Sequence, residues 1–290
     1  MKRELTLIFV IKIMFINNLY AYNNKNKCED YLSKGKPVEA ISAAKIISDK
    51  YDSSFCKAKA EYYQNNFAAA IKDLEISIKH ADLQADQMYA ILYKGIAERD
   101  NNQIKQSIKS LKHGLEVAKL GNTKYMAMEQ KFLYQIGLSY SALKDYFNAT
   151  DFLSKSLIIA ANDDERADAY NSLAIAHAAN KKYGKAVEFG LKSANTLQRS
   201  GQRNRYAEAI YSLSGYHFLD GNNSKAISLL DGLESFAEKN GSKYYQAKSL
   251  FEKALLYKNL KRQKDSDSSY QAAIRISEQI GAVDLISAYQ

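Results

Sequence analysis

Apolar residues recur along the chain at the spacing of one helix face, in blocks of about 40 residues that are clearest from residue 85 onward. Each block holds two amphipathic stretches with a short polar interval between them. The blocks close on a glycine or an asparagine, at steps of 41, 39, 40 and 40 residues: Gly121, Asn162, Gly201, Gly241 and Gly281. These residue types end helices because they accept left-handed backbone at low cost. The pattern predicts an all-α chain of paired helices joined by short turns.

Small residues occupy one fixed place in each stretch of a block. In the first stretches they are Gly95, Gly137, Ala174, Ser214 and Ala254, and in the second stretches Ser107, Ala149, Ala186 and Ala226. A small side chain lets two helix backbones approach closely, so these positions predict where the helices of a pair cross. One such pair cannot bury its apolar face alone, and neighbouring pairs must therefore stack.

One block shows the complete pattern. Leu133, Gly137 and Tyr140 follow one another at the spacing large-x2-L-G-x2-Y, and Ala149 then begins an A-x3-large segment. In this pattern the chain resembles tetratricopeptide repeat proteins over roughly residues 28–280. The period of about 40 residues is similar to the longer repeats of kinesin light chains and of bacterial peptide-sensing regulators.

The resemblance implies an all-α fold, a right-handed α-solenoid of about six to seven antiparallel helix pairs. Weaker repeats are expected over residues 25–82, clear repeats over residues 85–280 and a capping helix over residues 282–290. The related families bind peptide segments in a groove, so we expect a scaffold or adaptor that binds a peptide or a partner domain in its concave groove. The alternative is a sensing module that responds to a ligand or peptide and acts on a partner in trans.

The first 21 residues have the composition of an export signal. Two basic residues precede an apolar run over residues 5–16, which one lysine interrupts, and a short polar stretch ends at Ala21. We expect cleavage before Tyr22, which places residues 22–290 in a bacterial periplasm or outside the cell, without a membrane span. The alternative is an uncleaved segment that anchors the chain, although the apolar run is shorter than the roughly 20 residues a spanning helix needs.

The two cysteines, Cys28 and Cys56, both follow the predicted signal. An even number in an oxidising compartment is compatible with a disulfide, and two buried cysteines that fill helix contacts are equally compatible with the sequence. They occupy equivalent places in the first helices of two successive repeats. Such positions can be about 10 Å apart, which is too far for a disulfide without a local distortion.

First helices of successive repeats line the concave face in the fold that the resemblance implies. The repeat phase then predicts a partner-binding groove with these side chains: Leu92, Tyr134, Asn171, Tyr211 and Phe251, with Lys131 and Lys248 in a second row that also holds Tyr89, Asp168 and Glu208. Tyrosine suits such a surface because it combines a large apolar body with a polar tip. The same spacing is also typical of buried core aromatics. The carboxylate clamp of chaperone-binding relatives is absent, because the matching places hold Tyr134, Leu138, Asn171 and Ile175.

Composition and motifs give little sign of catalysis. The formal net charge of +9 is spread along the chain and forms no dominant basic patch, so we expect a protein or peptide partner and no nucleic acid. His177 and His217 share one repeat position and are expected to pack there. Nucleophile, metal-protease, phosphate-loop and dinucleotide motifs are all missing from the sequence. We therefore expect no enzyme activity, no cofactor and no metal.

Overall fold

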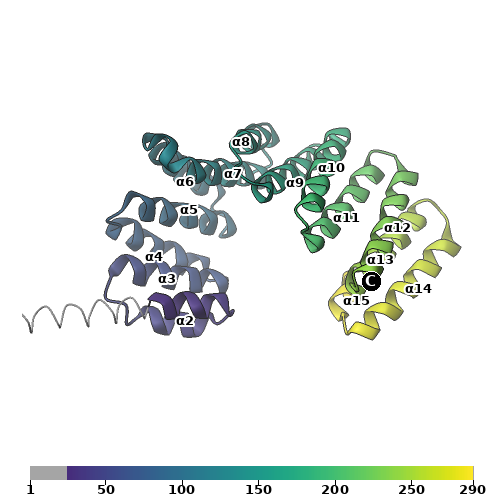
Figure 1. Cartoon of the computed structure of the whole chain (residues 1–290), viewed down its shortest axis with the longest axis horizontal. Helices are drawn as coiled ribbons and strands as arrows, with labels where there is room; N and C mark the ends of the chain where they lie inside the picture. The colour runs from purple at the N-terminus through teal and green to yellow at the C-terminus, as the bar shows by residue number, and fades with distance from the viewer. Residues whose placement is uncertain (1–24, 290) are drawn as a thin grey trace, which may run out of the picture. The chain divides into compact units, whose positions relative to one another are not determined.

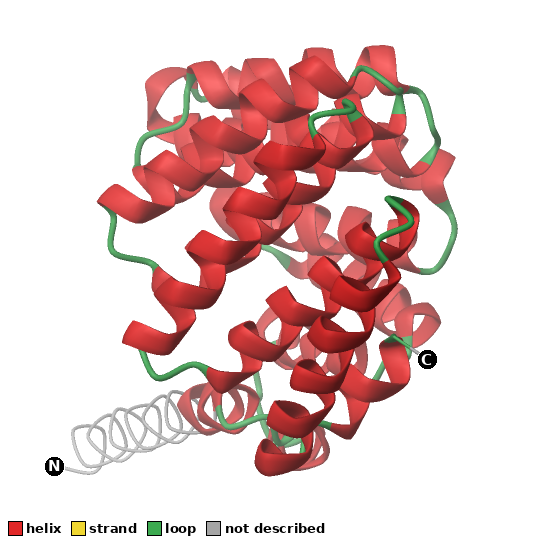
Figure 2. Cartoon of the chain, turned by 90° about the vertical axis from the view of Figure 1, so that its right-hand side faces the viewer, coloured by secondary structure: helices red, strands yellow, loops and turns green. Residues whose placement is uncertain are grey.

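The computed structural model describes residues 25–289, and all regular elements in that range are helices (Figure 1, Figure 2). The predicted all-α solenoid of successive helix pairs is confirmed. The chain divides into two compact units, with unit 1 ending at Asp145 and unit 2 beginning at Tyr146. Residues 1–21, the predicted signal, lie outside the described residues. Within residues 25–289 there is no helix whose length and apolar character would let it cross a bilayer.

Unit 1 begins with a helical segment over residues 25–33. Its further elements are α2 (Pro37–Ala44), α3 (Lys50–Tyr63), α4 (Phe67–His80), α5 (Gln84–Asp100), α6 (Ile104–Leu120), the short 3-10 helix η1 (Asn122–Tyr125) and α7 (Met126–Ala142). Each helix from α2 to α6 packs against the next one in the chain. Pro37 stands in the first turn of α2, where its missing N–H costs no hydrogen bond.

Unit 2 repeats the same arrangement with nearly constant helix lengths. It contains α8 (Tyr146–Ile158), α9 (Asp163–Ala179), α10 (Tyr183–Arg199), α11 (Arg203–Leu219), α12 (Asn223–Lys239), α13 (Lys243–Asn259), α14 (Gln263–Ile280) and α15 (Val283–Ala288). The helices α9 to α13 each have 17 residues, and α9, α11 and α13 start 40 residues apart. The short α15 packs on α14 and closes the apolar cluster of the last pair.

The predicted helix-ending residues divide into two groups. Gly201, Gly241 and Gly281 have positive φ values near 70°, as expected for left-handed backbone after a helix. Gly121 differs, with φ −86°, because the backbone continues directly into η1. Asn162 also differs, since its side chain caps the start of α9 by accepting a hydrogen bond from the Glu165 N–H at 2.9 Å.

A small residue on one helix makes room for a large ring on the next at a contact in unit 1. In unit 1, Gly114 of α6 leaves the space that the fully buried Phe132 ring of α7 fills. A side chain at position 114 would overlap this ring. The glycine and the large ring together fill this contact between α6 and α7.

Cys28 and Cys56 are joined as a disulfide in the structure, with their Cα atoms 6.4 Å apart. This separation is shorter than the roughly 10 Å expected for equivalent positions in stacked helices. The surrounding cluster explains the close approach, because it contains four buried alanines: Ala40, Ala43, Ala44 and Ala60. With so little side-chain volume between them, the two helices come within the distance that a disulfide spans.

Candidate partner-binding site on the first helices of unit 2

A pocket of about 350 Å³ is lined by residues of α9, α10, α11 and α13 in unit 2. We call it the unit 2 pocket; its polar and aromatic lining consists of Asp168, Asn171, Ser193, Asn204, Arg205, Glu208, Ser212 and Tyr245. Asp168, Asn171 and Glu208 belong to the rows that the repeat phase placed on the groove. These three residues of α9 and α11 line the same pocket.

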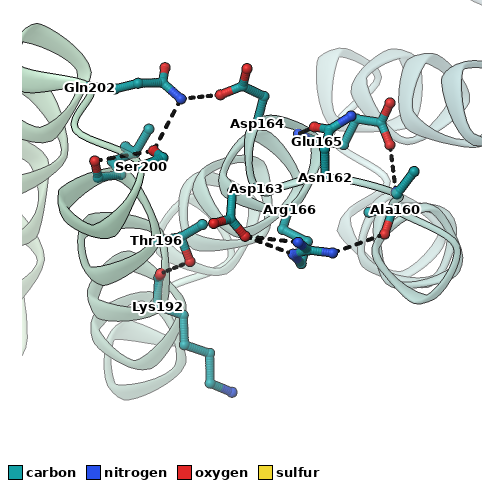
Figure 3. A network of polar contacts seen from close by, with 12 residues as sticks. Ala160, Asn162, Asp163, Asp164, Glu165, Arg166, Lys192, Thr196, Ser200 and Gln202 are labelled. Carbon is teal, nitrogen blue, oxygen red and sulfur yellow. Dashed lines mark hydrogen bonds and ion pairs between the residues drawn. The ribbon is translucent and has the colours of Figure 1, made fainter.

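The start of α9 is fixed to the turn before α11 (Figure 3), next to the wall of the unit 2 pocket that Asp168 and Arg205 form. Asp164 accepts a hydrogen bond from the Gln202 side-chain amide. Arg205 also donates to Asp164, at 3.2 Å, and it forms an ion pair with Asp168. Burial raises the pKa of Asp168, and the nearby guanidinium of Arg205 opposes that rise. The wall is thus a set of charges that are already paired.

The opposite wall joins α11 to α13. Lys248 forms an ion pair with Glu208 at 2.7 Å, and its Nζ lies 4.3 Å from the ring centre of Tyr211. Burial, with Glu208 nearby, raises the pKa of Tyr245 to about 12, so this phenol stays protonated near neutral pH. Lys248, which the sequence predicted in the second row of the groove, therefore links α11 to α13.

Three neutral polar side chains of the unit 2 pocket have no hydrogen bond to any other described residue. They are Asn171 on α9 and Asn204 and Ser212 on α11. An amide presents both a donor and an acceptor, and a hydroxyl can serve as either. These groups sit between two walls of satisfied charges, so they are the ones available to a ligand.

Tyr211 and Phe251, on the first helices α11 and α13, are covered by Tyr289 near the C-terminus. The Tyr289 ring stacks on Phe251 at 4.7 Å between ring centres, and its hydroxyl lies 2.8 Å from that of Tyr211. Tyr211 also donates to Glu252 at 2.9 Å. Phe251 is fully buried as a result, which corrects the expectation that it lines an open groove. Burial also raises the pKa of Tyr211 well above its usual value.

The remaining predicted groove residues belong to unit 1. Leu92 is buried, with 6% of its surface exposed, so it contributes to the core and not to an open surface. Lys131 and Tyr134 are half-buried on α7. The single row that the sequence predicted is therefore distributed over two units, and only Asn171 of that row lines the unit 2 pocket.

The sequence reasoning missed Arg205, Asn204 and Tyr245, which lie one turn closer to the helix starts than the predicted rows. The sequence does contain a sign that Arg205 belongs to the pocket: it precedes Glu208 by one helical turn and therefore lies on the same helix face. Among the described residues, there is also no cluster of histidine, cysteine and carboxylate side chains that could hold a metal ion. His177 instead stacks on Phe189, with ring centres 5.4 Å apart.

No protein-family model matches the chain, and no curated protein matches its sequence. Among solved structures, the apo form of RapI has a TM-score of 0.61 at 17% identity, over 90% of this chain and 99% of that one. A Pyrococcus horikoshii signal-transduction ATPase with a tetratricopeptide repeat sensor has a TM-score of 0.73 at 16% identity, over 99% of this chain and 48% of that one. The fold is that of tetratricopeptide repeat proteins.

A further similar structure is that of a Rap protein complexed with competence and sporulation factor. It has a TM-score of 0.58 at 11% identity, over 93% of this chain and 80% of that one. At these identities the similarity concerns the fold. The chain spans about half the length of the Pyrococcus protein.

Proposed function

We propose that the chain is a protein-interaction module that binds an extended peptide segment of a partner in the unit 2 pocket. The observation that carries this proposal is the amide of Asn171, which has no hydrogen bond to another described residue and lines a pocket whose charged walls are already paired. An extended peptide leaves backbone N–H and C=O groups free, and a side-chain amide can bind one of each. Tyr245 adds an amphipathic wall for the side chains of such a segment.

Charge favours a peptide over a nucleic acid as the partner. The unit 2 pocket contains the carboxylates of Asp168 and Glu208 and the single guanidinium of Arg205, and the second basic group beside it, Lys248, is bound to Glu208. A phosphate backbone would be repelled by the two carboxylates and would find no unpaired cation. The described polar groups also form no nucleophile and base combination, so the proposal assigns the module no reaction of its own.

We place this module in the periplasm or outside the cell. The basic start and the apolar run over residues 5–16 support export, and the Cys28–Cys56 disulfide suits an oxidising compartment. A sensing role in trans is the second candidate, and one structural comparison favours it: the Pyrococcus neighbour is described as having a tetratricopeptide repeat sensor.

A selection from a random peptide library on the purified chain tests the proposal. Selected peptides should bind the unaltered chain, and Asn171→Ala should weaken their binding about tenfold or more, because one ligand hydrogen-bond pair is lost. Asn195→Ala is the matched control, since Asn195 lies on the exposed side of the adjacent helix α10. Equal binding by the Asn171→Ala variant, with unchanged helical circular dichroism, would show that the unit 2 pocket is not the binding site.

A further inference from the structure

A second pocket, of about 280 Å³, lies in unit 1 between residues 25–33, α3 and α5. We call it the unit 1 pocket, and its lining combines charged side chains with four aromatic rings: Tyr51, Phe55, Tyr89 and Tyr93. The Phe55 ring stacks on Tyr51 with centres 5.4 Å apart, and it meets the edge of Tyr93 at 5.3 Å. These contacts fix the rings, so the pocket is formed before any ligand arrives.

The charges of the unit 1 pocket do not balance. Lys25 pairs with Asp52 at 2.6 Å, and Lys59 pairs with Glu29. Asp86 is the third carboxylate of the lining, and it has no ion pair with any described residue. Burial raises the pKa of Asp86, and the ammonium of Lys25, which is paired with Asp52, opposes that rise.

The aromatic wall already holds one positive charge. Lys59 Nζ lies 5.1 Å from the ring centre of Phe55, within the range of a cation–π contact. The hydroxyls of Tyr89 and Tyr93 have no hydrogen bond within the described part of the chain, and Tyr89 is 41% exposed. Because Asp86, Tyr89 and Tyr93 lie on one face of α5, their polar groups and rings are available to the same ligand.

We propose that the unit 1 pocket binds the side chain of a lysine or arginine from a peptide or partner protein. The cation would pair with Asp86, and its aliphatic stem would lie against Tyr89 and Tyr93. An anion would face three carboxylates, and a neutral apolar group would leave the Asp86 charge desolvated and unpaired. This site goes beyond the peptide-backbone recognition proposed for unit 2, and it is built from different residues.

Three short peptides with blocked ends serve as probes: glycine–lysine–glycine, glycine–arginine–glycine, and the same peptide with norleucine at the centre. Binding to the full chain is followed by saturation-transfer NMR. The lysine and arginine peptides should bind at least about fivefold more tightly than the norleucine peptide, since only they carry a charge for Asp86. Equal binding of all three would overturn the proposal.

Single substitutions test whether the charged peptides bind in the unit 1 pocket. Asp86→Asn should remove the preference for the charged peptides, whereas Asp82→Asn, at an exposed aspartate in the turn before α5, should leave it intact. Tyr89→Ala provides a second test, because this partly exposed residue can be truncated without opening the core. It should weaken binding of both charged peptides about threefold or more. Unchanged preference in both pocket variants would overturn the assignment.

Two further measurements distinguish a peptide side chain from a free amine as the ligand, and the unit 1 pocket from the unit 2 pocket as the site. The diamine cadaverine carries the lysine ammonium without a peptide; binding of cadaverine with no binding of the arginine peptide would overturn the choice of a peptide side chain. Asn171→Ala lies in unit 2 and should leave all these affinities unchanged. If that variant abolished probe binding, the unit 1 site would be wrong, independently of the library selection that tests unit 2.

Discussion

The two pockets use the same kind of helix but offer opposite chemistry. In the unit 1 pocket four aromatic rings contribute to the lining, and one carboxylate, Asp86, has no ion pair among the described residues. In the unit 2 pocket the carboxylates are paired, and the unsatisfied groups are neutral, chiefly Asn171. Tyr89 and Asp168 even share one repeat phase. The repeat thus fixes where a residue faces, while the residue type at that place remains free to vary.

The reason lies in packing. Positions between helices must fill a given volume, as Gly114 and Phe132 do together, so substitution there is constrained. Positions that face a pocket have no such partner to match. A stack of repeats can therefore carry different recognition chemistry in each unit without altering the contacts that hold the helices together.

The largest expected effect is a loss of stability that is confined to the core of unit 1. Phe132→Ala removes a fully buried ring from unit 1 and should cost about 3–5 kcal/mol of unfolding free energy. Hydrogen exchange should show lost protection in α6 and α7, with α11 to α14 largely unaffected, because contacts in a stack are local. Phe147→Ala is the control, since that side chain is 82% exposed. An equal loss of protection across both units would contradict their independence.

The next effect concerns the disulfide that lies only in unit 1. Replacing both Cys28 and Cys56 by serine should cost about 2–4 kcal/mol, because the cross-link restricts the unfolded chain. Urea unfolding monitored with a reporter in each unit should show the loss in unit 1 alone, and the variant should no longer respond to a reducing agent. Two alkylated thiols per chain in the unfolded, unreduced protein would rule out the bond.

The response to pH should have opposite signs in the two units. Burial, with Asp73 nearby, raises the pKa of Glu61 in unit 1 to about 7. Its stabilising contribution is present at low pH and is lost as the pH rises through about 7. Burial lowers the pKa of His177 in unit 2, so the contribution of that residue is present at neutral pH and is lost as the pH falls below about 6.5.

Hydrogen exchange, corrected for the intrinsic exchange rates, measures how the stability of each unit depends on pH. Between about pH 5 and pH 8, protection should fall by about 1 kcal/mol in α3 and α4 and should rise in α9 and α10. Glu61→Gln should remove the change in unit 1 and leave unit 2 as it was. A shift of the same sign in both units would show that other groups control the titration.

The smallest expected effects are the stability changes on replacing two glycines in helix interiors by alanine. A methyl group at Gly215 in unit 2 would meet no atom within 4 Å, so Gly215→Ala should stabilise α11 by about 0.5–1 kcal/mol. A methyl group at Gly95 in unit 1 would overlap the fully buried Leu111 side chain, and Gly95→Ala should destabilise the chain. Thermal unfolding of both variants measures the two signs; destabilisation by Gly215→Ala would show a contact that the structure does not contain.

Periodicity predicted the fold because the small crossing residues and helix-ending glycines depend on local backbone geometry. Gly201 and Gly281 end their helices as the sequence indicated. The site was predicted less well because burial of a phase-equivalent residue depends on distant segments. Phe251 is covered by Tyr289, which follows a short helix outside the clear repeats. The close approach of Cys28 and Cys56 likewise depends on a cluster of alanines that no single repeat reveals.

The constant 40-residue spacing of α9, α11 and α13 bears on how such a chain can change through recombination. Deleting residues 203–242 would join Gln202 to Lys243 and leave the helix phase intact, since one whole pair is removed. Duplication of the same segment would preserve the phase equally. Heritable change in unit 2 could therefore proceed in steps of one helix pair. Each step changes the chain by about 40 residues and exchanges part of the pocket lining, while the register of the remaining helices is retained.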